Sequence, residues 1–131
     1  MNSRTFRILH KRNSNHWKMS EIKAKAQGLD ANIHARNMEK MVHQTHNIYE
    51  SLVIIGKRAN QISVGLKQEL TSKLEDFATQ TETIEEVQEN KEQIEISKYY
   101  ERLPNPAIIA TNEYLHGDLH FHYKQIEEDE D

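Results

Sequence analysis

The stretch from Asn47 to Ile62, N-I-Y-E-S-L-V-I-I-G-K-R-A-N-Q-I, constrains the fold of this chain more than any other segment. Its aliphatic residues recur at spacings of three and four, which places them on one face of a helix. These residues are Ile48, Leu52, Ile55, Ala59 and Ile62. Asn47 suits the N-cap, and Glu50 would complete a capping box. The sequence therefore predicts a helix with an apolar stripe, beside which Lys57, Arg58 and Gln61 place long polar side chains.

The helical period continues beyond this stretch through Leu66, Leu70, Leu74 and Phe77. Gly65 predicts a bend or a boundary, because glycine inside a helix costs about 1 kcal/mol relative to alanine. Residues 79 to 83, T-Q-T-E-T, predict a break, and Thr83 with Glu86 suits the start of the next helix. Residues 93 to 97, Q-I-E-I-S, fit either the end of that helix or a short extended piece.

A second helix is predicted after Asn105-Pro106, since asparagine suits an N-cap and proline suits the first helical position. Gly117 fits the position just past its end. The alternation from Leu119 to Tyr123 then predicts a strand. The chain is therefore expected to be mainly α, a small helical domain over residues 47 to 123 with a short C-terminal strand. The acidic tail, residues 124 to 131, is expected to be disordered.

The N-terminal segment, residues 1 to 18, is basic: it carries Arg4, Arg7, Lys11, Arg12 and Lys18 and no acidic side chain. Such a segment can be an arm that touches nucleic acid, a targeting peptide, or a disordered extension, and we expect the last. Met19 offers an alternative start of the protein, before the sequence S-E-I-K. Residues 19 to 46 are expected to be a polar lead-in, in which Ile33, Met38, Met41 and Val42 indicate a short helix that leads into the core.

Composition limits the classes of protein to which the chain can belong. Only 36% of its 131 residues are hydrophobic and 29% are charged, so we expect part of its burial to come from a partner. The absence of cysteine excludes disulfides and thiolate metal sites and fits the cytoplasm. No apolar run approaches the roughly 20 residues that span a bilayer. The net charge of -4 and the ten acidic against four basic residues from 66 to 101 disfavour direct nucleic-acid binding.

No catalytic constellation is evident in the sequence. The histidines at 43 and 46, and those at 116, 120 and 122, lack a third ligand at a defined spacing, so we expect polar faces there rather than a metal site. The four glycines are not grouped into a phosphate loop, and there is no G-x-S-x-G sequence. We therefore assign the chain no catalysis, no metal and no cofactor of its own.

The stretch from Asn47 to Ile62 resembles the core helix of the omega subunit of bacterial DNA-directed RNA polymerase. The matching residues are Asn47, Tyr49, Glu50, Leu52, Val53, Lys57, Arg58, Ala59, Gln61 and Ile62. A second segment, P-N-P-A-I-I-A-T-N-E-Y-L-H-G-D-L, resembles a later part of the family that its archaeal and eukaryotic counterparts share. There the matching residues are Pro106, Ile108, Ile109, Ala110, Glu113 and Gly117.

The acidic stretch from 66 to 101 is longer than the corresponding link of common omega chains and looks like the Bacteroidetes variant. The N-terminal part that forms an alarmone site in some members has no match here. The resemblance implies a non-catalytic subunit that clamps the beta-prime subunit within a core of alpha, beta and beta-prime, and meets DNA and RNA only through that complex. It implies partner contacts at Asn47, Tyr49, Glu50, Leu52, Lys57, Arg58, Gln61, Ile62, Pro106, Ile109 and Glu113.

Other classes of protein fit parts of the same sequence. The heptad-like spacing from 48 to 77 also suits a free-standing helical adaptor or a coiled-coil protein. The basic N-terminal arm suits a small DNA-binding regulator, although the acidic middle argues against one. A histidine-based metallohydrolase has the least support.

Overall fold

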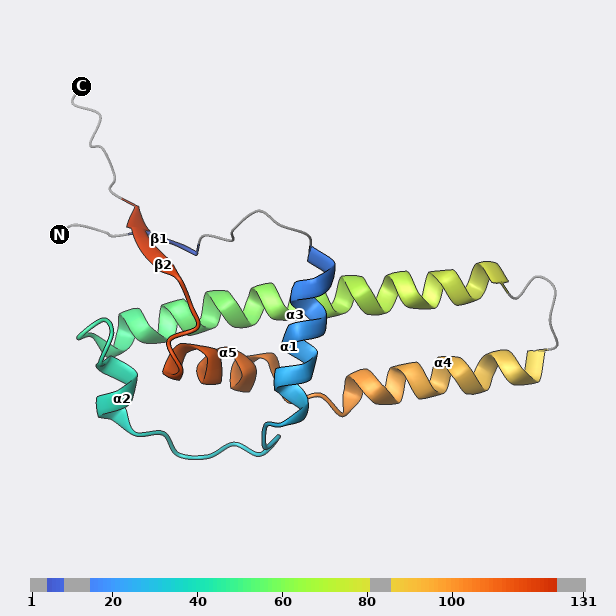
Figure 1. Ribbon diagram of the computed structural model, residues 1–131, viewed down its shortest axis with the longest axis horizontal. Coiled ribbons are helices and arrows are strands. Elements are labelled where there is room, and N and C mark those ends of the chain that lie inside the picture. Colours follow the sequence, from blue (N-terminus) through green and yellow to red (C-terminus); the bar gives the residue numbers. More distant parts are fainter. Residues whose placement is uncertain (1–4, 9–14, 81–85, 125–131) are drawn as a thin grey trace, which may run out of the picture.

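The computed structural model describes residues 5–8, 15–80 and 86–124, with side chains over 19–78 and 91–123. This part is mainly helical, as the sequence predicts (Figure 1). Its elements in chain order are β1 (Thr5–Ile8), α1 (Asn15–Gln27), α2 (Met38–Val42), α3 (Ile48–Gln80), α4 (Glu86–Glu101), α5 (Pro106–Leu115) and β2 (Phe121–Lys124).

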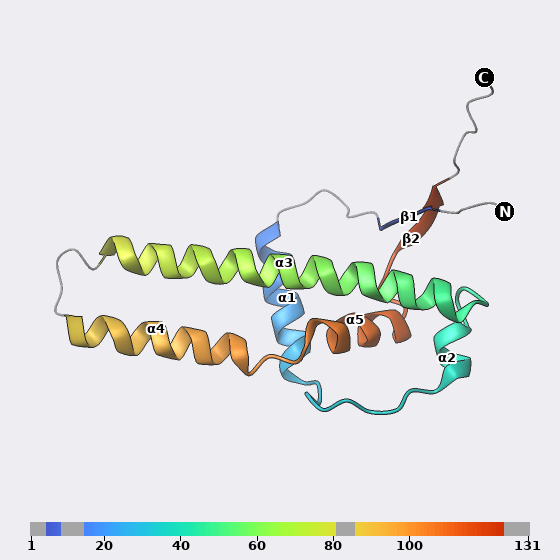
Figure 2. The same ribbon diagram turned by 180° about the vertical axis from the view of Figure 1, so that it is seen from behind.

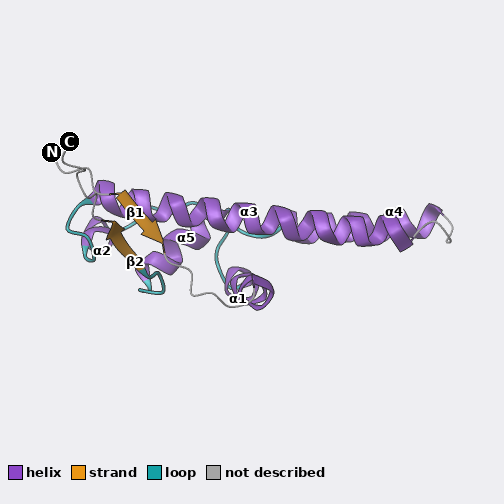
Figure 3. Cartoon of the chain, turned by 90° about the horizontal axis from the view of Figure 1, so that it is seen from above, coloured by secondary structure: helices purple, strands orange, loops and turns teal. Residues whose placement is uncertain are grey.

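The 33-residue helix α3 organises the molecule. At 1.5 Å per residue it is about 50 Å long. Its first half packs against α5, and α4 lies alongside its second half, so that α3 and α4 form a projecting arm (Figures 1 and 2). Helix α1 crosses α3 on one side and is seen nearly end-on in Figure 3. The long rod therefore connects a compact end to an extended arm.

Three local expectations for α3 have different outcomes. Asn47 caps the helix, and its side-chain oxygen accepts a hydrogen bond from the Tyr49 amide at 3.0 Å. Glu50 does not complete the expected capping box, because its carboxylate instead accepts a hydrogen bond from the Tyr123 hydroxyl at 3.0 Å. The expected bend at Gly65 is wrong, because α3 runs through this position without interruption. Met19 lies against Gly65, so the missing side chain makes room for the crossing helix α1.

The predicted break at residues 79 to 83 begins within α3, which ends at Gln80, and residues 81 to 83, Thr83 among them, lie outside the described residues. Helix α4 includes residues 93 to 97, so this segment is the helical alternative and not the extended one.

The hydrophobic core lies at the compact end, around the first half of α3. Its buried apolar side chains come from α1, α2, α3 and α5, namely Ile22, Ala26, Met41, Ile54, Ile55, Ile62, Ile109, Ala110 and Tyr114. None of these nine residues belongs to α4. The arm therefore depends on contacts other than those of this core.

The predicted apolar stripe of α3 needs a correction at Leu52, whose surface is 51% exposed. Ser51 and Arg58 are buried instead. They follow the same helical spacing as Ile55 and Ile62, so α5 covers a row in which polar and apolar residues alternate. Polar side chains can occupy such a row when partners satisfy them, and both residues have partners inside the chain.

The N-terminal part of the chain, before α3, also differs from expectation. Residues 5–8 form β1, which pairs antiparallel with β2 in the register Thr5↔Lys124 to Ile8↔Phe121, while residues 1–4 and 9–14 lie outside the described residues. Helix α1 begins at Asn15 and brings Ile22 and Ala26 into the core, so the polar lead-in contains core residues. The short helix expected from Ile33, Met38, Met41 and Val42 is present as α2, where Asn37 is the N-cap, but Ile33 lies outside it and is exposed.

The C-terminal predictions are confirmed. Asn105 caps α5, and its side chain accepts a hydrogen bond from the Ala107 amide at 2.9 Å. Gly117 follows the helix with a φ of 75°, a left-handed conformation that suits glycine. The predicted short strand is β2. The acidic tail beyond residue 124 lies outside the described residues.

Candidate functional site

The two helices that carry the resemblance pack against each other at a buried ion pair. Arg58 of α3 donates from Nε to Oε2 of Glu113 in α5 at 2.6 Å, and from Nη2 to Oε1 at 3.1 Å. The side chains are only 10% and 9% exposed. Arg58 also donates from Nη1 to Gln61 at 3.3 Å. A planar guanidinium matches a carboxylate at two points, so this contact fixes the relative position of α3 and α5.

A buried hydroxyl network fastens α2 to the same pair of helices. Ser51 Oγ and Tyr114 Oη lie 2.8 Å apart, and both hydroxyls are within hydrogen-bond distance of the Met41 carbonyl, at 2.7 and 3.0 Å. Thr45 Oγ1 lies 2.6 Å from Ser51 Oγ, and Gln44 donates to the Tyr114 carbonyl at 2.7 Å. Hydrogen bonds as well as apolar packing therefore fix the arrangement of α2, α3 and α5 at the compact end of the molecule.

Apolar side chains on α3 remain exposed, and we call them the exposed apolar face. They are Tyr49, Leu52, Val53 and Val64, with exposed fractions of 77%, 51%, 45% and 47%. The first three occupy positions i, i+3 and i+4, and Val64 follows Val53 by about three helical turns. Lys57 lies one turn after Val53 and is also exposed. This row suits contact with another protein, because it places apolar and basic groups on one accessible surface.

The eleven expected interface residues divide by burial into three groups. Asn47, Tyr49, Leu52, Lys57 and Gln61 are exposed, and Glu50 and Pro106 are half-buried. The other four, Arg58, Ile62, Ile109 and Glu113, are buried within the chain. At these four positions the side chains are enclosed by their own domain, which leaves little of their surface for a partner. Val64 is an accessible residue that sequence reasoning missed, although its spacing from Val53 signals the same face.

A groove of about 830 Å³ runs along α3 beside α1. Met19 and Ile22 line it from α1, while Gln61, Val64 and Gln68 line it from α3. Gly65 also lines it, and a Cβ atom at this position would be 3.0 Å from Met19 Sδ. The groove thus opens next to the exposed apolar face, at Val64 and Gln61.

A second charged cluster joins the arm to α1. Lys23 forms an ion pair with Glu69, and Lys23 and Lys73 lie 5.4 and 5.6 Å from the centre of the Tyr100 ring. Burial alone would raise the pKa of Glu69, but the hydrogen bond and charge of Lys23, with Tyr100 and Lys73, lower it below its usual value. Burial, followed by the charge of Glu69, raises the pKa of Tyr100. The cluster therefore favours a charged carboxylate and a neutral phenol.

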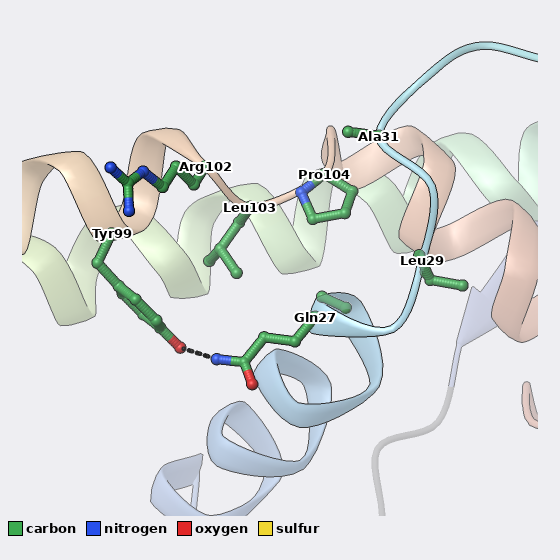
Figure 4. Close-up of a pocket in the computed structure, with 8 residues that line it drawn as sticks. Gln27, Leu29, Ala31, Tyr99, Arg102, Leu103 and Pro104 are labelled. Atoms are coloured by element: carbon green, nitrogen blue, oxygen red, sulfur yellow. Dashed lines mark hydrogen bonds between the residues drawn. The ribbon is translucent and has the colours of Figure 1, made fainter.

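A small pocket of about 260 Å³ lies where the ends of α1 and α4 meet (Figure 4). Leu29, Leu103 and Pro104 line it, and Gln27 donates a hydrogen bond to the Tyr99 hydroxyl at 3.1 Å across its rim. Its volume is below the range of ordinary ligand pockets, so we assign it no ligand.

Among the described residues, no group of three or more histidine, aspartate or glutamate side chains is placed to hold a metal ion. None of the described helices is long and apolar enough to cross a membrane. Comparisons with protein families, curated proteins and solved structures find no match to this chain.

Proposed function

We propose that this chain is the omega subunit of a bacterial DNA-directed RNA polymerase. In this role it has no catalytic activity of its own and binds the beta-prime subunit, which promotes assembly and stability of the core enzyme. It would work in the cytoplasm and meet DNA and RNA only through the polymerase. The observation that carries the proposal is that the two segments resembling omega, which are well separated in the sequence, meet at the Arg58–Glu113 ion pair.

The accessible surface supports a role in assembly. The core is small, and the exposed apolar face would leave water when a partner covers it. At about 25 cal/mol per Å², burial of such side chains favours association. Because α3 and α5 are already fixed by internal contacts, less ordering accompanies binding than for a disordered segment. A subunit that binds only the folded partner stabilises it by mass action.

The burial of Arg58 determines which residues should be altered in the test. An Arg58 substitution would disturb the domain, so Leu52 on the exposed apolar face is the better probe. Tagged full-length protein should co-purify alpha, beta and beta-prime from its native host. The Leu52→Glu variant should lose these subunits, because it places a charge in the contact. Ile33→Glu is the matched control, since Ile33 is 92% exposed in a separate loop.

The two measurements test the omega role and the exposed apolar face separately. Absence of polymerase subunits with the unaltered protein would rule out the omega role. Co-purification that survives Leu52→Glu would keep the role and reject this face.

The free-standing helical adaptor is the second candidate, and the α3–α4 arm favours it. The arm is an antiparallel helical pair that extends beyond the core (Figure 1). Self-association at micromolar concentration without polymerase, measured by analytical ultracentrifugation, would support this adaptor instead.

A further inference from the structure

The arm carries an open groove of its own, separate from the exposed apolar face. It lies between α3 and α4 and has a volume of about 360 Å³. Phe77 from α3 and Tyr99 and Tyr100 from α4 supply aromatic surface, and Glu92 and Glu95 supply carboxylates. Lys73 of α3 also lines the groove, so its two carboxylates outnumber its one ammonium group. Aromatic rings next to carboxylates are a chemical environment that attracts organic cations.

Helical geometry aligns the carboxylates with one of the rings. Glu92, Glu95 and Tyr99 occupy positions i, i+3 and i+7 of α4, so their side chains follow one face. Both glutamates are exposed, and neither forms an ion pair with a basic group among the side chains that the structure describes. Two like charges at this spacing repel each other, and a bound cation would remove the repulsion.

The aromatic part of the groove is held in place by internal contacts. Tyr99 and Tyr100 meet edge to face, with ring centres 5.4 Å apart and an interplanar angle of 88°. The Tyr99 hydroxyl also accepts the hydrogen bond from Gln27. Lys23 and the lining residue Lys73 already place their Nζ atoms 5.4 and 5.6 Å from the Tyr100 ring centre, so Tyr99 and Phe77 are the rings left for an added cation. The rings are therefore ordered before any ligand arrives.

We propose that this groove binds an arginine-bearing basic segment of a partner protein. The guanidinium stacks against aromatic surface and donates to the Glu92 and Glu95 carboxylates, a combination that its planar fork supplies and an ammonium does not. The local charge complements such a partner, because residues 66 to 101 contain ten acidic and four basic residues. The proposal does not depend on the polymerase role, since the groove shares no residue with the exposed apolar face.

The test measures binding of short fluorescein-labelled peptides to the full-length protein by fluorescence anisotropy. One peptide alternates arginine with serine, a second has lysine in place of arginine, and a third has glutamate. We expect the arginine peptide to bind most tightly. The Glu92→Gln, Glu95→Gln double variant should weaken it about tenfold, because both charged hydrogen bonds are lost.

A charge-matched control separates the groove from the general acidity of the arm. Glu75→Gln, Glu101→Gln removes the same charge from exposed positions of α3 and α4 outside the groove, and it should change affinity by less than about twofold. Tyr99→Leu should reduce the preference for arginine over lysine. Equal weakening by both double variants, or equal binding of the arginine and lysine peptides, would overturn the proposal. Circular dichroism of each variant confirms that the helices are retained.

Discussion

Arg58 and Glu113 are far apart in the sequence and are joined at two points in the structure. Their contact connects α3 to α5 inside the domain, where both side chains are at most 10% exposed. A buried ion pair of this kind need not stabilise the domain more than apolar residues of the same shape would. Its effect is to define which surfaces of the two helices face each other.

Removing one partner of this pair should be much more harmful than removing both. Arg58→Met leaves the Glu113 carboxylate buried without its cation, and we expect a loss of about 3 to 5 kcal/mol in the free energy of unfolding. The Arg58→Met, Glu113→Leu double variant should recover most of that loss. Urea denaturation of the four proteins in this cycle measures the coupling. Additive losses in the double variant would contradict a direct interaction.

The outcomes at particular residues show what sequence reasoning can predict. The caps at Asn47 and Asn105 and the turn at Gly117 depend on local chemistry, and they were predictable. Burial of Arg58 was not, because it depends on a carboxylate in a distant part of the sequence. Dependence on distant residues also explains the outcome at Leu52, which periodicity places in the apolar stripe. Ser51 takes the buried position instead, because its hydroxyl hydrogen-bonds to the Met41 carbonyl and to the Tyr114 hydroxyl.

Helix α1 is a different case, since a usable signal was present. Met19, Ile22 and Ala26 recur at spacings of three and four, but the intervening charged residues make the segment look uniformly polar. The exposed apolar face could be located only with the structure, because periodicity shows which residues share a helical face but not which face α5 covers.

Two glycines of α3 should respond differently to alanine. Nothing lies within 4 Å of a Cβ atom built on Gly56, so Gly56→Ala should stabilise the protein by up to about 1 kcal/mol through helix propensity alone. A Cβ atom on Gly65 would lie 3.0 Å from Met19 Sδ, so the gain from Gly65→Ala should be smaller. Thermal unfolding measures both changes. In a Met19→Ala background the difference between the two glycine variants should shrink, and an unchanged difference would show that Met19 is not its cause.

The Lys23–Glu69 pair should contribute to stability in a pH-dependent way. The folded protein lowers the pKa of Glu69 from its ordinary value of 4.5, where burial opposes the shift and Lys23 is the main cause of it. The unfolded chain therefore binds the proton more readily, so the contribution is present above pH 4.5 and is lost as the pH falls through the folded-state pKa. For a partly exposed pair we expect a contribution of up to about 1 kcal/mol.

Denaturation of the Glu69→Gln variant at a series of pH values checks this dependence. The variant should be less stable than the unaltered protein near neutral pH, and the difference should narrow in acid. Glu75→Gln is the control, because Glu75 is an exposed carboxylate on the same helix. A stability difference for Glu69→Gln that stays constant from neutral to acidic pH would argue against the ion pair as its source.

Tyr114→Phe should reveal the strength of the buried hydroxyl network. Tyr114 is fully buried, and its hydroxyl contacts both the Met41 carbonyl and Ser51. Removing the hydroxyl deprives these buried groups of a partner, and we expect a loss of about 1 to 3 kcal/mol in the free energy of unfolding. Tyr49→Phe is the matched control at a side chain that is 77% exposed, and it should change stability by less than about 0.5 kcal/mol. Equal effects of the two substitutions in urea denaturation would show that the network adds nothing to the apolar packing of α5.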